Sequence, residues 1–452
     1  MILHNSNNGR FFNQFCFWAP FGYMAGILVL HQQELLYAAQ DLSGWQPGME
    51  SFAIACQSMF GLLEWLAGFA TQLFYYPLAG IAMLLLLWYL AYRLLGYGLH
   101  FSESMRWMSI LPLFGILGAI TQVGYWIYTL RMPSYWLLPT CLFLWLAVTV
   151  ALMRATRFWM GFPMLLLLTP WGQLPHWHPF EGDPEMMSYP IWGALAAVAL
   201  TVAVALTPWR TSSLTGWRRL FPIALLTAGI TLSAMLDYHN PLFRAELRMQ
   251  QAVEAGQWER LKQETDAVAA TQRQPTRQMQ LLAQGAALIT QHTPTDTVTL
   301  APIYGIKPQM RSNPPLHMAQ MGGPTVYYLF GLSAYCYRWN FENATEYGFA
   351  PQRLRMMLRC ALLNGEWDLA RKYVRLLRQY PFQREWAESM AELIGQPEAI
   401  ARHPQLGPLT AWQWHDNFLM FDKLPEKVLL QYLPLTRPIQ WNYPPHYDIV
   451  LY

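Results

Sequence analysis

The chain has 452 residues, of which 54% are hydrophobic and 15% aromatic, while only 13% are charged and the formal net charge is +3. Soluble domains carry about 25% charged residues, so this composition excludes an ordinary water-soluble protein as a description of the whole chain. Lysine is absent from residues 1–237, whereas the rest of the chain has ordinary charge density. We therefore predict two domains that join near Asp237: a membrane domain, 1–237, and a water-soluble domain, 238–452.

Uncharged apolar stretches recur through the first domain, and a bilayer-spanning helix needs about 20 such residues. They lie at 11–33, 65–92, 107–130, 132–153, 158–175, 190–209 and 220–236. The first stretch lacks a small-residue cleavage site, which favours a retained span over a removed signal peptide. The sequence thus predicts an all-α fold with about seven transmembrane helices.

Basic residues near the span ends predict the orientation of this domain, because cytoplasmic loops are enriched in Lys and Arg. With a cytoplasmic N-terminus, the outside loops hold a single arginine, Arg131, and collect several acidic residues. The cytoplasmic loops hold Arg93, Arg106, Arg154, Arg157, Arg210, Arg218 and Arg219. We therefore expect the second domain to lie outside the cytoplasm.

Residues 52–76 form an amphipathic segment after the first span. Small and polar residues recur every three to four positions, among them Gly61, Glu64, Gly68 and Gln72, and leucines and phenylalanines occupy the other face. We predict a helix that lies along the membrane surface with its apolar side in lipid. The alternative is a tilted span whose polar seam packs inside the bundle.

The second domain contains two similar segments, AVEAGQWE (252–259) and ALLNGEWD (361–368). In each, a glycine suits the left-handed turn that ends one helix, and a tryptophan begins the next. This helical-hairpin pattern is typical of tetratricopeptide repeats, so we predict a tetratricopeptide-like domain of stacked hairpins.

The cysteines and the absence of nucleotide-binding motifs indicate little about function. Cys336 and Cys360 are the two cysteines of the second domain. They either pair across neighbouring helices or remain two buried thiols. No Walker loop and no GxGxxG motif occurs, so we expect neither nucleotides nor nucleic acid as partners.

Two blocks resemble a bacterial membrane-protein family of unknown function that has an N-terminal multi-span region and a C-terminal tetratricopeptide-like region. They are GLLEWLAGFATQLFYYPLAG (61–80) and YGFAPQRLRMMLRCALLNGEWDLARKYVRLLRQYPFQREWAESM (347–390). The resemblance implies a multi-pass protein of the bacterial inner membrane whose C-terminal domain is periplasmic. It implies no activity.

The order of elements after the first span is similar to that of membrane glycosyltransferases that use polyprenyl-phosphate-linked sugars. An acidic residue, Glu34, stands at the outer end of the span, and the amphipathic segment with Glu64 and Gln72 follows. In those enzymes a carboxylate of this loop is the base for the acceptor hydroxyl, which implies that role for Glu34 or Glu64. The family usually has Asp or an acidic pair there, whereas this chain has Glu34 and, seven residues on, Asp41.

Further residues join this hypothesis as candidate substrate-binding groups: Asp41, Gln72 and, in the outer half of the third span, Gln122. Several residues of this hypothesis have a simpler interpretation. Glu34 and Asp41 are acidic residues in an outside loop, and Glu64 is suited to a packing hydrogen bond between helices. An interfacial aromatic belt explains the neighbours of Gln122 equally well.

A second outer loop, PHWHPFEGDPE (175–185), contains candidate metal ligands. His176, His178 and Asp183 offer imidazole and carboxylate groups within a short segment. A divalent cation bound there would neutralise a lipid phosphate. A proline-rich loop at the membrane surface is the alternative.

Two functional hypotheses follow. The first is a glycosyl or related lipid-phosphate transferase at the outer face of the membrane, with membrane lipids and a polyprenyl-phosphate-linked sugar as partners. The second is a non-enzymatic envelope scaffold that binds a protein partner through its helical-repeat domain.

Overall fold

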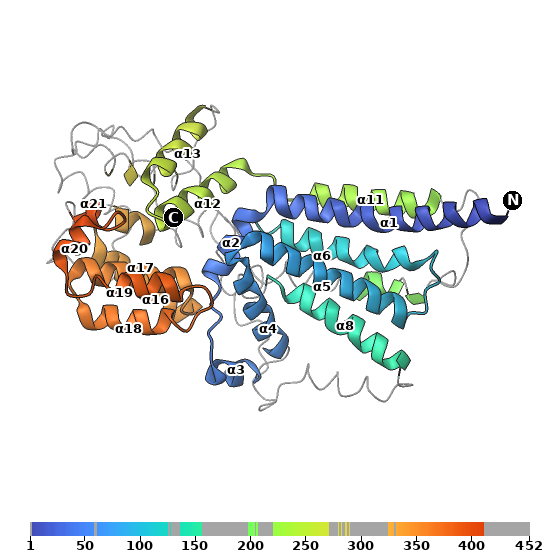
Figure 1. Ribbon diagram of the computed structural model, residues 1–452, viewed down its shortest axis with the longest axis horizontal. Helices are drawn as coiled ribbons and strands as arrows, with labels where there is room; N and C mark the ends of the chain where they lie inside the picture. The colour runs from blue at the N-terminus through green and yellow to red at the C-terminus, as the bar shows by residue number, and fades with distance from the viewer. Residues whose placement is uncertain are drawn as a thin grey trace, which may run out of the picture. The chain divides into compact units, whose positions relative to one another are not determined.

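The structure is a computed structural model, and its described parts are helical (Figure 1). It describes residues 2–57, 61–124, 127, 136–155, 198–203, 205–206, 220–270, 324–329 and 331–410, with positions 279, 282, 285, 286 and 289. No strand occurs in these residues, so the predicted all-α class is confirmed for them. The chain divides into two compact units: unit 1, residues 1–239, and unit 2, residues 240–452.

Unit 1 is built on long helices that pack side by side (Figure 1). α5 packs against α8, α1 packs against α5 and α11, and α11 packs against α6. The bounds of these helices are α1 Ile2–His31, α5 Pro77–Gly98, α6 Leu111–Thr121, α8 Leu138–Ala155 and α11 Leu220–Leu236. The 3₁₀ helix η2, Arg106–Ile110, leads directly into α6. The apolar sequence of the unit therefore forms a bundle.

The contact between α5 and α8 shows how two apolar helices are held together. A Cβ atom at Gly98 would lie 2.6 Å from the Val150 Cγ1 and 2.8 Å from the Val150 carbonyl carbon, so only glycine permits this approach of the backbones. The buried Trp88 indole Nε1 donates a hydrogen bond to the Thr140 Oγ1 at 3.1 Å. Small residues and interhelical hydrogen bonds are the usual means by which helices associate in lipid.

The predicted number of seven spans is too high for the described residues. They contain two helices that are long and apolar enough to cross a membrane, α5 and α8, and at most three if α11 is joined to the helix that follows it. Residues 106–121 form a shorter apolar helix, and the polar residues HNSNNGR occupy the first turns of α1. The predicted span 158–175 and most of 190–209 lie outside the described residues.

The segment 52–76 does not form the single helix that its pattern predicts. It contributes to three short helices, with bounds α3 Met49–Ala55, α4 Gly61–Thr71 and η1 Gln72–Tyr75. The backbone of Tyr76 is extended, with φ −108° and ψ 92°, and Pro77 stands in the first turn of α5. Proline has its φ fixed near the helical value and needs no N–H in the first turn, so it begins a helix. The second long helix therefore begins at Pro77, not at residue 65.

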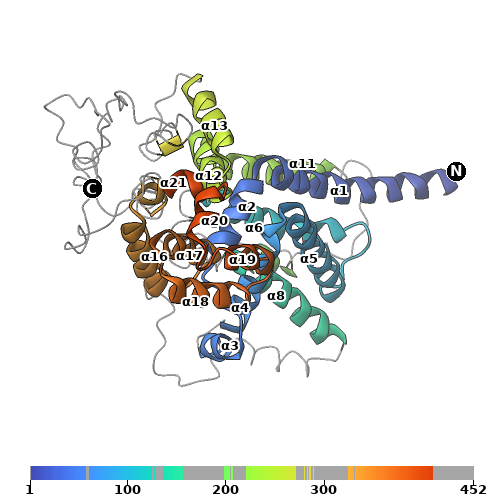
Figure 2. The same cartoon turned by 60° about the vertical axis from the view of Figure 1, so that its left-hand side comes forward.

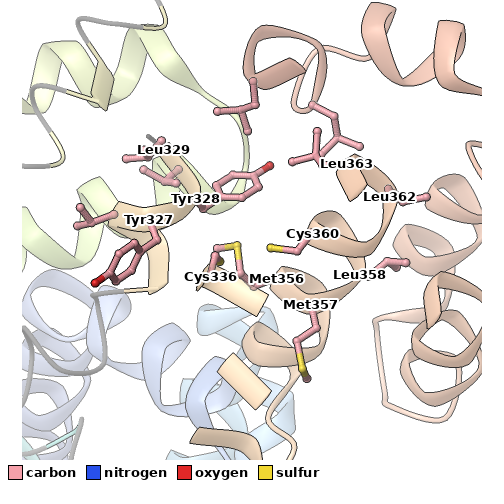
Figure 3. Packing of buried hydrophobic residues seen from close by; sticks show 14 of the residues in the cluster. Tyr327, Tyr328, Leu329, Cys336, Met356, Met357, Leu358, Cys360, Leu362 and Leu363 are labelled. Carbon is pink, nitrogen blue, oxygen red and sulfur yellow. The ribbon is translucent and has the colours of Figure 1, made fainter. Parts of the chain in front are cut away.

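Unit 2 consists of helical hairpins, and α16, α17 and α18 lie side by side in two views (Figures 1 and 2). The helix bounds are α12 Pro241–Glu254, α13 Trp258–Ala270, α16 Ser333–Tyr347, α17 Pro351–Asn364, α18 Trp367–Leu377, α19 Arg384–Ala391, α20 Pro397–Arg402 and α21 Gly407–Thr410. Every residue of α17 from Arg353 to Leu363 is buried, so this helix forms the centre of the hydrophobic core (Figure 3).

Buried charges connect three helices of unit 2. The Glu254 Oε2 of α12 lies 2.8 Å from the Arg359 Nη1 and 3.5 Å from the Arg355 Nη2, both of α17. The Arg355 Nη1 donates to the Gln383 Oε1, just before α19, at 3.1 Å. The Trp386 ring of α19 covers the Arg359 guanidinium, with its centroid 5.2 Å from the Arg359 Cζ. Buried charges are costly without partners, so this network holds α12, α17 and α19 in one arrangement.

The glycines of the repeated segments end their helices as predicted. Gly256 has φ +64° and Gly365 has φ +72°, both in the left-handed region. The next helices begin at Trp258 and Trp367. The hairpin prediction is confirmed at both places. Glycine is favoured at these turns because a residue with a Cβ atom is destabilised by about 1–2 kcal/mol in this conformation.

We expect Gly256→Ala to destabilise unit 2 more than Gly365→Ala. Both variants place a Cβ atom in the left-handed region, which costs about 1–2 kcal/mol. At Gly256 the new atom would also lie 2.4 Å from the Gln405 Cγ and 3.2 Å from its Cα, whereas at Gly365 the nearest side-chain atom is 3.6 Å away. Pulse proteolysis of the detergent-solubilised full chain in urea measures both losses. Equal losses would contradict the steric part of the prediction.

Candidate functional site

The break between α1 and α2 begins the polar end of unit 1. α1 ends at His31, Gln32 has φ −118° and ψ 2°, and α2 runs from Gln33 to Leu42. The backbone groups stay paired across the break, because the Gln32 N–H donates to the Leu28 carbonyl at 3.3 Å and the Gln32 carbonyl accepts from the Leu36 N–H at 2.9 Å. The chain therefore changes direction here without losing backbone hydrogen bonds.

The side chain of Gln32 points inward and binds the end of α11. Its Nε2 donates to the Asp237 Oδ1 at 2.7 Å, and both residues are buried. The His239 Nε2 lies 3.6 Å from the other oxygen of the same carboxylate. A buried carboxylate needs such donors, so this contact ties the start of α2 to the residue that follows α11.

A second buried amide contact joins α2 to η1. The Gln40 Nε2 donates to the Gln72 Oε1 at 3.3 Å, and the Gln72 Nε2 donates to the Gly68 carbonyl at 3.4 Å. The rings of Tyr37 and Tyr75 lie beside this contact, with centroids 6.2 Å apart. α2 is thus fastened at both its ends, by Gln32 before its first turn and by Gln40 in its last.

Of the predicted residues, Gln72 takes part in this contact, and Asp41 follows Gln40 in α2. Gln72 is 1% exposed and Asp41, adjacent to Gln40, is 4% exposed. Because both side chains are buried, a substrate would reach them only after a side chain or helix moved.

The two predicted catalytic carboxylates lie on separate short helices. Glu34 stands in the first turn of α2 and Glu64 in the first turn of α4, and both are partly exposed. Glu34 shares one face of α2 with Asp41, because seven residues are nearly two turns and about 10 Å along the axis. Glu34 is therefore a partly exposed carboxylate of α2, the helix that contributes Gln40 to the buried amide contact.

Gln122 belongs to the same end of the bundle. It follows α6, and its N–H donates to the Gly118 carbonyl at 3.0 Å. The preceding Thr121 carbonyl accepts from the Tyr238 N–H at 3.1 Å. Gly124, with φ +51°, permits the Tyr238 ring to approach to 2.7 Å from where a Cβ atom would lie. The segment with Gln122 thus packs on the residues around Asp237.

The predicted metal ligands His176, His178 and Asp183 lie outside the described residues. Within the residues that the structure does describe, no group of three or more His, Cys, Asp or Glu side chains is arranged to hold a metal ion. The divalent cation stays a prediction.

Sequence reasoning missed Gln32, Gln40 and Asp237, which form the buried contacts. A signal was present: each is an amide or acid at or near a helix end, where an unpaired buried polar group is costly. The pairing itself joins residues more than 200 positions apart in the chain, which no local pattern indicates.

The sequence matches a family of unknown function, DUF6057, over residues 113–435. The chain belongs to this family. The match includes the block 347–390, so the resemblance to a family of unknown function is confirmed there, and it begins after the block 61–80. No curated protein and no solved structure matches the chain. Membership of DUF6057 carries no activity, so a function has to be argued from the residues themselves.

Gln32→Ala is expected to destabilise unit 1 by about 1–3 kcal/mol, because the Asp237 carboxylate would stay buried without this donor. Gln33→Ala is the matched control. Its amide is partly exposed, and its Nε2 binds the Val29 carbonyl of the preceding helix at 2.7 Å. Thermal unfolding of the full chain in detergent, followed by tryptophan fluorescence, compares the two. A loss at Gln33 equal to that at Gln32 would contradict the assigned role of the Asp237 contact.

Proposed function

We propose that this protein is a membrane transferase that moves a sugar from a polyprenyl-phosphate carrier to an acceptor hydroxyl at the outer face of the bacterial inner membrane. The observation that carries the proposal is the break at Gln32. It sets a partly exposed carboxylate, Glu34, on a short helix directly after a long apolar helix and above a buried layer of amides.

The short helices between α1 and α5 supply a surface suited to lipid. On α3, Met49 is 79% exposed and Ile54 is 61% exposed, and on α4 the side chains of Leu66 and Phe69 are also exposed. Apolar side chains on short helices beside a spanning helix favour a position in the headgroup layer. A polyprenyl phosphate carries its reacting bond at that same level, since its chain lies in the bilayer and its phosphate at the surface.

Glu34 is proposed to act as the general base. Its carboxylate takes the proton of the acceptor hydroxyl as the hydroxyl oxygen attacks the anomeric carbon of the sugar, and the polyprenyl phosphate leaves with the bonding electrons. The contacts of Gln32 with Asp237 and of Gln40 with Gln72 hold α2, and so keep Glu34 in position. Such support matters because misplacing a catalytic group by about 1 Å can cost about 100-fold in rate.

Glu64 is the second candidate base, in the first turn of α4. Unit 2 is proposed to be periplasmic and tetratricopeptide-like and to select the acceptor, and its helical hairpins support the repeat assignment. The scaffold hypothesis uses the same hairpins to bind a protein partner without chemistry. The two hypotheses differ in whether Glu34 is needed.

The test compares Glu34→Gln with Glu50→Gln, an exposed carboxylate on α3 of the same loop. Membranes that contain each full-length variant receive polyprenyl-phosphate hexoses with a radiolabelled sugar, and loss of label from the lipid is measured. We expect Glu34→Gln to lower the rate by about 10²–10⁴-fold, as for loss of a general base, and Glu50→Gln to keep the wild-type rate.

Two outcomes would overturn the proposal. One is a wild-type protein that leaves every carrier unchanged, and the other is a Glu34→Gln variant as fast as the wild type. If the envelope glycan profile changes on deletion of residues 240–452 but not with Glu34→Gln, the scaffold hypothesis is favoured instead.

A further inference from the structure

Two thiols meet in the core of unit 2. Cys336 belongs to α16 and Cys360 to α17, two helices that pack along each other, and neither cysteine has exposed surface. Figure 3 shows Cys336 and Cys360 next to each other between these helices, and the two side chains are hydrogen-bonded. The two residues are 24 positions apart in the chain, and both are free thiols in this structure.

The position of Cys336 is held by its own helix. The Asn340 Nδ2, one turn further along α16, donates to the Cys336 carbonyl at 2.8 Å and to the Cys336 Sγ at 3.4 Å. The amide therefore fixes the position of the sulfur relative to α16. Tyr328 and Met356, both buried, belong to the same core cluster (Figure 3). The two thiols are positioned by packing and by a hydrogen bond.

The described residues place no metal site at the pair. A structural zinc site needs four protein ligands. In the described part of unit 2 no group of three or more His, Cys, Asp or Glu side chains is placed to hold a metal ion. Oxidation to a disulfide uses both sulfur atoms and needs no further ligand.

We propose that Cys336 and Cys360 form a disulfide bond that joins α16 to α17. The oxidant is the disulfide of a thiol–disulfide exchange partner. One cysteine thiolate attacks that disulfide to give a mixed disulfide, and the second thiolate then attacks the sulfur of the first cysteine. The pair loses two protons and two electrons, and the partner leaves as a dithiol.

The exchange belongs to folding, before α16 closes onto α17. Burial raises the pKa of the Cys336 thiol well above its ordinary value, and the hydrogen bond to Cys360 raises it further. A thiol in that state supplies little of the thiolate that exchange requires. After closure the same burial shields the disulfide from reductants. The inference rests on the proposed periplasmic location of unit 2, because disulfides form in an oxidising compartment, and it does not use the transferase activity.

The experiment counts thiols in the full-length protein. Cells are quenched with N-ethylmaleimide in denaturant, which blocks every free thiol, and the protein is then reduced and labelled with a 5-kDa polyethylene-glycol maleimide. The chain has five cysteines. We expect two labels after reduction, and a Cys336–Cys360 cross-linked peptide in an unreduced digest. Because the blocking is done in denaturant, the count does not depend on how a variant folds.

Matched variants make the count specific. Cys336→Ser and Cys360→Ser should each remove both labels, since the remaining partner is free and is blocked at the first step. Cys16→Ser, in α1, should leave two labels. All five thiols blocked before reduction in the wild type would overturn the proposal, as would two labels that persist in Cys360→Ser.

A stability measurement gives a second, independent readout. Closing a loop of this length should raise the unfolding midpoint of the oxidised full chain by about 5–10 °C over the reduced chain. The shift should vanish in the Cys336→Ala, Cys360→Ala double variant. A wild-type midpoint that reductant does not change would count against the disulfide.

Discussion

The hydrogen bond from Gln32 to Asp237 is the interaction on which the polar end of unit 1 depends. A buried carboxylate that follows an apolar helix has no contact with water, so it requires a hydrogen-bond donor from the protein. Gln32, the residue between the end of α1 and the start of α2, supplies this donor. The contact thus joins the residue at the break to the buried carboxylate.

The direction of α2 follows from that contact, and with it the surroundings of Glu34. A helix that simply continued α1 would carry Gln40 away from η1. Because the chain turns at Gln32, Gln40 reaches Gln72, and the inner face of α2 becomes buried while its first turn stays partly exposed. The fixed position of α2 supports the proposed role of Glu34, because a general base has to be held within reach of the proton that it takes.

Unit 2 also contains buried polar groups that are paired within the protein, and here they are charged. Arg355 and Arg359 lie in α17, which is buried on every side. Glu254 of α12 forms ion pairs with both guanidinium groups. The desolvation cost of such a cluster is recovered only in one geometry, so the cluster selects how the hairpins pack more than it adds to their stability. The adjacent thiols of Cys336 and Cys360 occupy the same core.

Patterns of short range were predictable from the sequence alone. The all-α class, the glycine turns at Gly256 and Gly365 and the helix starts at Trp258 and Trp367 follow from composition and from local backbone preferences. These features depend on neighbours within a few positions. Among the described residues, fewer long apolar helices occur than the hydropathy predicts. Hydropathy also misplaced the start of the second one, because it does not register that extended backbone at Tyr76 precedes a proline.

Only the tertiary structure decided which polar residues meet. Gln32 with Asp237, Gln40 with Gln72, and Cys336 with Cys360 are brought together by packing between separate helices. Each partner on its own has a bland interpretation as a polar or small residue at a helix end or in a core. Their significance arises because burial removes water and leaves each of them only the protein to bond with.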